Sequence, residues 1–400
     1  MRDELFLIHS NLLNSISMDK KRHLYNRINW DARGICIAGA RGTGKTTLIL
    51  QHLTERYDRD KCLYVSGDNI NIIAEGLFNT AKDFFAFGGE TFVVDEVHKY
   101  PDWSQEVKNI YDSFPQKSII ISGSSTLDLT KARYDLSRRV VYYRLEGLSF
   151  REFLKFEYDI DIAPLSLEEI VKDHVSISSS ILKKGPVLKY FNEYLEYGYY
   201  PYFLEGKQDY NSKVMGAVEK VLFEDIGIVF NLPVNKLPAM KKLLWLVATS
   251  HPFTLNIEGI ATDLGITRPT VYNYLEILEN ADLFKSVKAL GKGAGFIRKP
   301  GKLYFENTNL LLAIAGSAKI EAQSGTLRET FFVNQLSQNH KISLHEKCDF
   351  VIDEKYHFEI GGPSKKGKQI SGIESSYLAI DGIETGFQKR IPLYLFGFLY

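Results

Sequence analysis

The chain has 400 residues, of which 49 are Lys or Arg and 49 are Asp or Glu, so its formal net charge is zero. A chain of this length exceeds one typical domain, and we expect three compact units. A neutral balance gives no global attraction to nucleic acid or to an anionic membrane, so any nucleic-acid contact must come from a local patch. Cys36, Cys62 and Cys348 lie far apart in the sequence, which argues against a disulfide framework and against a zinc site.

The N-terminal segment MRDELFLIHSNLLNS carries charged residues early and has no long apolar core, so it does not resemble a secretory signal. The longest apolar runs, such as residues 309–316, are much shorter than the ~20 residues that a membrane helix requires. These features predict a soluble, cytoplasmic protein without a membrane segment.

Five short, β-rich runs recur between residues 34 and 147. Their sequences are GICIAGA, CLYVSGD, TFVVDE, SIIISGS and VVYYRLEG, and the stretches between them are long enough for helices. Near-continuous apolar strands that alternate with helical spacers indicate a parallel sheet covered on both faces, because each crossover needs a helix. The sequence therefore predicts an α/β nucleotide-binding fold.

A glycine-rich loop, GARGTGKT, follows the first run and precedes the helix-like TTLILQHLTERY. Strand, loop and helix in that order are the context that a phosphate-binding P-loop needs. The glycines let backbone N–H groups turn towards phosphate oxygens, and the helix N-terminus adds a favourable dipole. Lys45 would reach the β- and γ-phosphates of ATP, and the Thr46 hydroxyl would bind Mg²⁺. The predicted nucleotide-binding residues are Gly39, Ala40, Arg41, Gly42, Thr43, Gly44, Lys45, Thr46 and Thr47.

An acid pair ends the apolar run TFVVDE, which we expect to be a neighbouring strand of the same sheet. Asp95 would hold Mg²⁺, mostly through water, and Glu96 would polarise the attacking water. The alternative is a solvated turn at a strand end. The order of this pair after the P-loop favours the catalytic interpretation.

Two weaker elements complete the predicted site. The run SIIISGSS ends at Ser124, which would sense the γ-phosphate or orient water; an ordinary cap between strand and loop is the alternative. Arg138 and Arg139 precede the last run, and one of them would stabilise the transition state as an arginine finger. A surface charge pair is the alternative for these arginines.

The order of GARGTGKT, VVDEVHKYPDW, IIISGSS and SRRVVYYRLEGLSFREFL resembles prokaryotic AAA-type ATPases, related to archaeal and STAND-class ATPases, that carry a C-terminal domain of unknown function. The resemblance covers nearly the whole chain and implies that GARGTGKT is a Walker A motif and TFVVDE a Walker B motif. It places Ser124 on the sensor position and Arg139 on an arginine that usually follows glycine. Arg138 replaces that glycine here, which leaves open which arginine reaches a nucleotide.

The stretch LNIEGIATDLGITRPTVYNYLEILENADLF has the spacing of a helix-turn-helix. Gly265 fits the positive φ of the turn, and an apolar stripe gives the second helix a buried face. That helix would expose Arg268, Thr270, Tyr272 and Asn273, side chains that can contact phosphates or base edges.

A basic, Gly-rich segment without acidic residues spans positions 285–302. It predicts a wing that contains Lys288 and Lys292, which makes nucleic acid a candidate partner. A solvated β-hairpin or a protein-docking module remains the alternative, since winged helices are often reused that way. Glu276 and Glu279 on the preceding helix, together with the neutral chain, weigh against a strong nucleic-acid contact.

Three acids near the C-terminus reproduce the outline of PD-(D/E)xK nucleases, a fold that the resembled family is thought to share. Glu329 lies on a predicted helix, and Asp349 and Glu359 lie on successive predicted strands. The catalytic pattern also needs a lysine two residues after the second acid, where this chain has Gly361. Lys365, Lys366 or Lys368 would have to fold back into that position, and the simpler interpretation is a fold whose chemistry is lost or altered. A terminal strand, IPLYLFGFLY, closes the predicted domain.

The predicted architecture is an AAA-type P-loop ATPase domain over residues 1–155, a helical connector over 156–236, a winged helix over 237–306 and a restriction-endonuclease-like α/β domain over 307–400. We expect a Mg²⁺-dependent ATPase that acts as a nucleotide-driven switch. Two other hypotheses stay open: a DNA-binding regulator that uses the winged helix, and a metal-dependent nuclease. Oligomerisation stays open: an arginine finger that acts in trans would demand a neighbouring subunit, whereas one that acts in cis would not.

Overall fold

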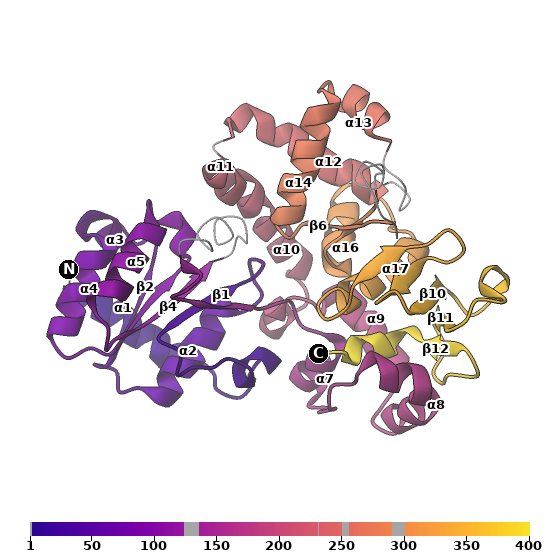
Figure 1. Ribbon diagram of the computed structural model, residues 1–400, viewed down its shortest axis with the longest axis horizontal. Helices are drawn as coiled ribbons and strands as arrows, with labels where there is room; N and C mark the ends of the chain where they lie inside the picture. Colours follow the sequence, from indigo (N-terminus) through magenta and orange to yellow (C-terminus); the bar gives the residue numbers. More distant parts are fainter. Residues whose placement is uncertain (1, 124–135, 231, 250–255, 290–300) are drawn as a thin grey trace. The chain divides into compact units, whose positions relative to one another are not determined.

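The computed structural model describes residues 2–123, 136–230, 232–249, 256–289 and 301–400. Contacts between residues divide the chain into two compact units, Met1–Gly147 and Leu148–Tyr400, and Figure 1 shows them in sequence colours. Residues 156–236 therefore belong to the same compact unit as the C-terminal sheet, while the boundaries of the four predicted domains stay predictions. Within the described ranges, no helix is long and apolar enough to cross a membrane.

The N-terminal unit is built on one sheet with the strand order β2-β3-β4-β1-β5. The strands are β1 (Gly34–Ala38), β2 (Cys62–Ser66), β3 (Thr91–Asp95), β4 (Ser118–Gly123) and β5 (Val141–Arg144). Every neighbouring pair is parallel, which confirms the predicted parallel α/β fold. Because β1 lies between β4 and β5, the loop that follows it starts from the interior of the sheet.

Helices cover both faces of this sheet. They are α1 (Arg2–Ser15), α2 (Lys45–Arg56), α3 (Ile70–Glu75), α4 (Leu77–Ala86) and α5 (Trp103–Ser113). Ile35 and Ile37 of β1 pack in the core with α2, whereas Cys36 packs in the core with α3, α4 and α5. Successive side chains of a strand point to opposite faces, so an uninterrupted apolar strand serves two cores at once.

The second unit begins with helices and ends with a sheet. Its helices are α7 (Phe150–Tyr158), α8 (Leu167–Leu182), α9 (Val187–Tyr197), α10 (Tyr210–Lys220), α11 (Ile226–Val229), α12 (Leu237–Thr249), α13 (Ile257–Leu264), α14 (Arg268–Asn280), α16 (Thr308–Ser317) and α17 (Ser324–Leu336). Capping boxes begin α7 at Ser149 and α8 at Ser166, each with a glutamate three residues later. Such boxes satisfy backbone N–H groups that have no partner within the helix, so the sequence itself marks these two starts.

The C-terminal sheet has the order β12-β11-β10-β9-β8. Its strands are β8 (Ile342–Leu344), β9 (Phe350–Ile352), β10 (Tyr356–Gly361), β11 (Ser376–Ile380) and β12 (Arg390–Pro392). β8, β9 and β10 pair antiparallel, whereas β10, β11 and β12 pair parallel. The predicted terminal strand is wrong beyond Pro392, because residues Leu393–Phe398 form a 3-10 helix with every side chain buried. An apolar run without alternation fits a segment that is enclosed on all sides.

Two helices and a hairpin follow one another in the region predicted to be a winged helix. α13 and α14 are joined through Gly265, whose φ is +63°, and antiparallel strands β6 (Phe284–Val287) and β7 (Lys302–Phe305) follow. The Thr267 side chain accepts a hydrogen bond from the Thr270 N–H and so caps α14. These elements occur in the predicted order, and the winged-helix assignment itself stays a prediction.

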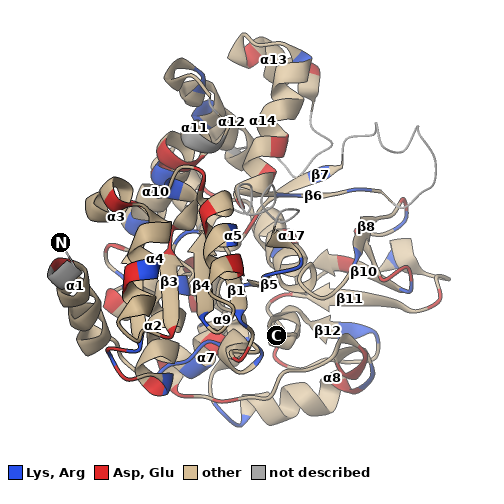
Figure 2. Ribbon diagram, turned by 60° about the vertical axis from the view of Figure 1, so that its left-hand side comes forward, with Lys and Arg blue, Asp and Glu red and all other residues tan. Residues whose placement is uncertain are grey.

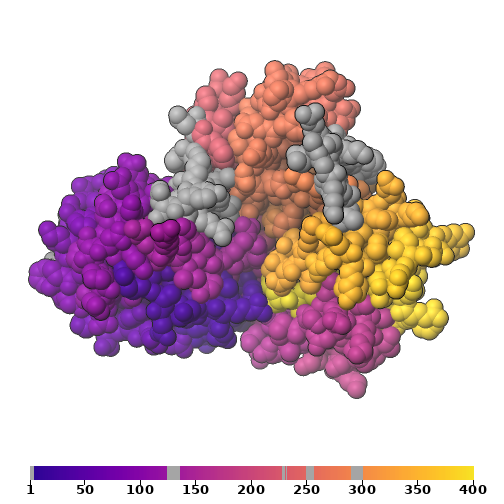
Figure 3. Space-filling view, in the orientation of Figure 1, coloured from indigo at the N-terminus to yellow at the C-terminus, as the bar shows by residue number. Residues whose placement is uncertain are grey.

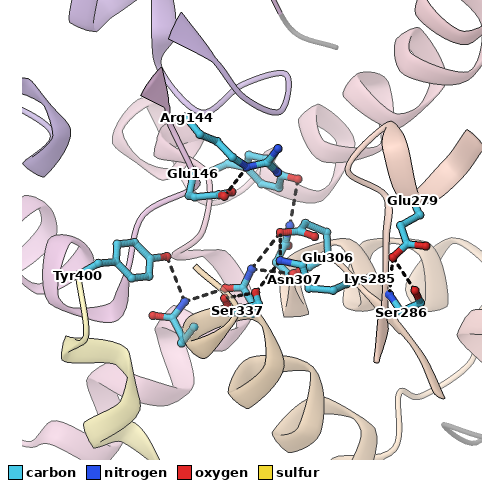
Figure 4. Close-up of polar contacts among 12 residues, drawn as sticks. Arg144, Glu146, Glu279, Lys285, Ser286, Glu306, Asn307, Ser337 and Tyr400 are labelled. Atoms are coloured by element: carbon cyan, nitrogen blue, oxygen red, sulfur yellow. Dashed lines mark hydrogen bonds and ion pairs between the residues drawn. The ribbon is translucent and has the colours of Figure 1, made fainter. Parts of the chain in front are cut away.

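Buried polar contacts join the hairpin to the C-terminal helix. Lys285 Nζ donates to Glu306 Oε1 at 3.1 Å and to Ser337 Oγ at 2.7 Å (Figure 4). Asn334 Nδ2 donates to the Glu306 carbonyl at 2.7 Å. Glu306 is only 2% exposed, and a buried carboxylate needs such partners to offset its desolvation. The contacts therefore tie segments predicted to be separate domains into one unit.

The two ends of the second unit also lie together. In Figures 1 and 3 the magenta residues that follow position 150 lie beside the yellow C-terminal residues. Ser149 Oγ and Arg151 Nε both donate to the Tyr400 carbonyl, at 3.0 Å and 2.8 Å. Figure 2 shows Lys and Arg interspersed with Asp and Glu along the ribbons of both units, which agrees with the neutral composition.

His52 on α2 is a buried titratable group that predicts a pH-dependent stability of the N-terminal unit. Its ring stacks on Trp30 with 3.8 Å between centroids, and it is 3% exposed. Burial, helped by nearby Arg56, lowers the pKa of His52 to about 4. The unfolded chain therefore takes up the proton first, and the free energy of unfolding falls as the pH is lowered from about 6.5 to about 4, by on the order of 1 kcal/mol or more.

We expect His52→Phe to keep the stack but to lose this part of the pH dependence. Urea unfolding curves of both proteins at about pH 7.5 and about pH 5 measure the difference. Equal losses of stability in the two proteins on acidification would contradict the assignment.

Candidate functional site

The P-loop connects β1 to α2 at the carboxyl ends of the parallel strands. Gly42 and Gly44 have φ values of +85° and +94°, a backbone region in which side chains other than glycine are strained. Gly39 is required for a different reason: a Cβ there would lie 2.2 Å from the Leu145 carbonyl oxygen. The three glycines of the loop are therefore explained by two positive φ angles and by the close approach of the Leu145 carbonyl.

Lys45, the first residue of α2, folds back over the loop. Its Nζ donates to the carbonyls of Gly39 and Ala40, both at 2.9 Å, and the residue is 4% exposed. The ammonium group therefore lies within the loop where the sequence predicts phosphates. A buried cation at a helix N-terminus favours anionic ligands.

Asp95 is the centre of the polar contacts beside the loop. Its Oδ2 accepts hydrogen bonds from Thr46 Oγ1 at 2.5 Å and from the Tyr64 hydroxyl at 2.6 Å. Its Oδ1 accepts one from the Glu96 N–H at 2.9 Å and a second from Ser122 Oγ. The structure thus brings together Thr46 and Asp95, the two predicted Mg²⁺ ligands. A hydroxyl next to a carboxylate is an oxygen donor set that suits Mg²⁺.

Tyr64 and Ser122 were not among the predicted site residues. They lie on β2 and β4, the two strands that flank β3, and burial followed by the charge of Asp95 raises the pKa of Tyr64. The only sequence signal would have been a polar residue inside an otherwise apolar strand. Which polar residues would contact Asp95 depends on the strand order, and the sequence alone does not give that order.

Glu96 lies between the P-loop and the 3-10 helix that follows β3. Its Oε2 is 3.8 Å from an Arg41 guanidinium nitrogen and 3.5 Å from His98 Nε2. The Glu96 backbone has φ +49° and ψ +39°, a left-handed conformation that costs a non-glycine residue about 1–3 kcal/mol. In this conformation the Glu96 carboxylate faces the loop residue Arg41.

Arg138 and Arg139 lie near the amino ends of the strands, whereas the P-loop follows the carboxyl end of β1. The Arg139 carbonyl approaches Gly34 at the start of β1, whereas the loop starts at the end of that five-residue strand, a separation of about 16 Å along the strand. The Arg139 guanidinium makes two hydrogen bonds to Asp112, both 2.8 Å long. The Arg139 guanidinium is therefore held by Asp112 near the start of β1, away from the P-loop. Ser124, the predicted sensor, lies outside the described residues.

Two of the three C-terminal acids line one cavity, and the third contacts a lysine of its lining. Asp349 and Glu359 line a cavity of about 430 Å³ together with Lys302. Glu329 Oε2 lies 3.5 Å from Lys302 Nζ and accepts a hydrogen bond from the Tyr304 hydroxyl at 2.7 Å. Burial raises the pKa of both glutamates. The acids that the sequence singled out are therefore brought together.

Lysines neutralise this acidic cluster. Lys365 Nζ lies 2.6 Å from Glu359 Oε1, and a Cβ at Gly361 would lie 2.8 Å from the Lys365 side chain. Lys365 thus occupies the space that the missing lysine of the nuclease pattern would fill, while Lys302 lies 4.0 Å from Asp349. In the part of the chain that the structure describes, no three His, Cys, Asp or Glu side chains are arranged to hold a metal ion.

The predicted nucleic-acid residues do not form one continuous basic surface among the described residues. Arg268 makes an ion pair with Glu258 of α13, Tyr272 is 50% exposed on α14, and Lys288 is exposed after β6. Lys292 lies outside the described residues. Nucleic-acid contact therefore stays a prediction.

Comparisons with known proteins agree with the geometry of the P-loop. Residues 31–154 match the family model of an AAA domain, and residues 188–321 match a domain of unknown function (DUF8612). The uncharacterized protein MJ1637 of Methanocaldococcus jannaschii is 25% identical over 391 residues, which covers 89% of this chain and 81% of that protein. An uncharacterized protein of Haemophilus influenzae is 22% identical and covers 86% of this chain and 87% of its own length.

Among solved structures, the Walker-type ATPase PABY2304 of Pyrococcus abyssi aligns with a TM-score of 0.43 and 12% identity, over 76% of this chain and 99% of that one. The match to the AAA family model coincides with the sheet, the P-loop and the acid pair of the N-terminal unit. Residues 31–154 therefore form an AAA-type domain with a P-loop.

Proposed function

We propose that the N-terminal unit binds ATP with Mg²⁺, hydrolyses it to ADP and phosphate, and works as a nucleotide-driven switch. The observation that carries the proposal is the 2.5 Å contact between Thr46 Oγ1 and Asp95 Oδ2, next to the buried ammonium of Lys45. A hydroxyl, a carboxylate and an ammonium group at a helix N-terminus are the groups that phosphoryl transfer requires.

The loop residues bind and orient the triphosphate. N–H groups of residues 39–44 and the ammonium of Lys45 hold the phosphate oxygens, while Thr46 and Asp95 would hold Mg²⁺. The ion supplies neutralisation of the charge that develops on the phosphates. Tyr64 and Ser122 keep the Asp95 carboxylate in a fixed orientation through their hydrogen bonds.

Glu96 is the general base of the proposed reaction. Its carboxylate accepts a proton from the attacking water, whose oxygen forms the new bond to the γ-phosphorus as the bond to ADP breaks. Arg41 and His98, at 3.8 Å and 3.5 Å, hold Glu96 at the mouth of the loop. Arg139, at the far edge of the sheet, would complete the site of a neighbouring copy rather than its own.

We do not extend the proposal to a nuclease. The acids Glu329, Asp349 and Glu359 make ion pairs or hydrogen bonds with Lys302, Lys365, Tyr304 and backbone N–H groups. A carboxylate that already faces an ammonium group gains less from a metal ion. This observation favours a structural role for the acidic cluster, in which ion pairs stabilise the fold, over cleavage of a phosphodiester.

Lys45→Ala tests phosphate binding. Loss of the ammonium should weaken ATP binding and lower turnover by about 10²-fold or more, because the charge acts in a buried site. Nucleotide affinity and phosphate release, measured on the purified full chain, check both effects. Lys61→Ala removes an exposed lysine of the same unit and should leave both values unchanged. Wild-type turnover in Lys45→Ala would reject the proposed site.

Glu96→Gln separates binding from chemistry. The amide cannot accept the proton, so turnover should fall by about 10²–10⁴-fold, while ATP affinity stays within a few-fold of wild type. The measurement is phosphate release at saturating ATP beside an equilibrium binding curve. Glu90→Gln, at an exposed position of the same unit, is the matched control. A variant that binds and turns over ATP normally would remove Glu96 from this role.

Arg139→Ala tests whether one copy of the chain completes the site of another. The variant should lose most turnover, and mixing it with an equal amount of Lys45→Ala should restore roughly a quarter of the wild-type rate, because random assembly pairs an intact P-loop with an intact arginine at about one site in four. Arg138→Ala should stay active. Undiminished turnover in Arg139→Ala, or a mixture with no recovery, would contradict this role.

A further inference from the structure

A short segment after β5 lies against the start of the P-loop. The Leu145 N–H donates to the Ala38 carbonyl at 2.7 Å, and the Leu145 carbonyl leaves no space for a side chain at Gly39. Two residues later this segment reaches Gly147, the last residue of the N-terminal unit. The start of the loop and the end of the unit are therefore in direct contact.

Arg22 connects the other end of the loop to the same segment. One guanidinium nitrogen, Nη1, donates to the Thr43 carbonyl at 2.5 Å. The other, Nη2, donates to the carbonyls of Glu146 at 2.7 Å and Gly147 at 2.9 Å. Arg22 is 5% exposed, and a buried guanidinium that donates to three carbonyls fixes their relative positions, because its donors form a planar fork.

The bond from Arg22 also sets the direction of a loop N–H. A peptide group is planar and trans, so its carbonyl and its N–H point in opposite directions. The Thr43 carbonyl faces Arg22, and the Gly44 N–H of the same peptide therefore points away from Arg22. Gly44 is the N-cap of α2, where N–H groups bind phosphate. Arg22 thus holds one phosphate-binding peptide group in a fixed orientation.

The backbone near Arg22 is itself fastened to α2. Gln51 Nε2 donates to the carbonyls of Ser17 and Lys20, at 2.8 Å and 3.0 Å, and Gln51 is 1% exposed. The guanidinium is therefore carried by the same helix that begins with the P-loop lysine. Because these hydrogen bonds fix the backbone that carries Arg22, we expect a shift of the loop to move residues 146 and 147 as well.

Residue 148 is anchored within the second unit. The Leu148 N–H donates to the Tyr199 carbonyl at 2.8 Å, and its carbonyl accepts a hydrogen bond from the Tyr194 hydroxyl at 2.8 Å. Gly147 is held by Arg22 in one unit, and Leu148 is held by two tyrosines in the other. A single peptide bond separates the two anchors.

We infer that Arg22 is a positioning residue that couples phosphate occupancy of the P-loop to the junction between Gly147 and Leu148. The inference rests on the proposed nucleotide binding and names the contact through which nucleotide state reaches the second unit. Bound phosphate restricts the motion of the 43–44 peptide group. Through its hydrogen bonds, Arg22 then restricts the Glu146 and Gly147 carbonyls as well. The backbone hydrogen bonds at the junction therefore open less often.

Hydrogen exchange of the full chain, with and without Mg²⁺–ATP, tests the coupling. In the wild type, nucleotide should slow exchange both in the loop with the start of α2 and in residues 143–153, the latter by about fivefold or more. In Arg22→Ala the loop should still be protected by nucleotide, whereas residues 143–153 should exchange at the nucleotide-free rate. Arg56→Ala removes an arginine that makes an exposed ion pair with Asp31 and should behave as the wild type.

Arg22→Lys keeps the charge and provides a readout if Arg22→Ala does not fold. A lysine cannot span three carbonyls in a plane, so this variant should bind nucleotide and lose the protection of residues 143–153. Retained protection there in either folded variant would overturn the inference. No nucleotide-induced protection anywhere in the wild type would instead overturn the proposed nucleotide binding, so the two failures are distinguishable.

Discussion

The hydrogen bonds that converge on the Asp95 carboxylate are the constraint around which the N-terminal unit is organised. Donors come from α2, β2 and β4 and from the backbone at Glu96, and the residue is 2% exposed. A buried anion requires several fixed donors, and only a sheet in which β3 lies between β2 and β4 provides them. The strand order, the position of the P-loop helix and the proposed metal site therefore depend on one another.

The parts of this site that are local in sequence could be predicted, and the rest could not. The loop from Gly39 to Thr46 is recognisable because its turns, its lysine and its helix start are consecutive. The donors Tyr64 and Ser122 come from other strands, so their role depends on the order in which the strands pair. Arg22 precedes the loop by some twenty residues and has no motif of its own; its importance lies in three backbone carbonyls, which leave no trace in a sequence.

The second unit illustrates the same division between pattern and packing. Capping boxes mark the starts of α7 and α8 in the sequence, and the spacing of the three acids of the C-terminal cluster is also a sequence pattern. Their neutralisation by Lys302 and Lys365 was not predictable as a set, since these lysines lie on a strand of the hairpin and on a loop after β10. The composition of the terminal apolar run predicts a strand. A buried strand and a buried 3-10 helix can both be continuous apolar runs, so composition does not separate them.

The opposite placement of the P-loop and Arg139 on one parallel sheet has a consequence for symmetry. Under the proposed mechanism each copy offers a nucleotide at one sheet edge and an arginine at the other, so the two surfaces that meet are different. A two-fold dimer satisfies such a contact only if each copy places its arginine at the loop of the other, whereas a head-to-tail contact satisfies it once at each interface. If the contact is head to tail, it repeats from copy to copy, and the copies would form a closed ring or an open filament in which each chain completes the next.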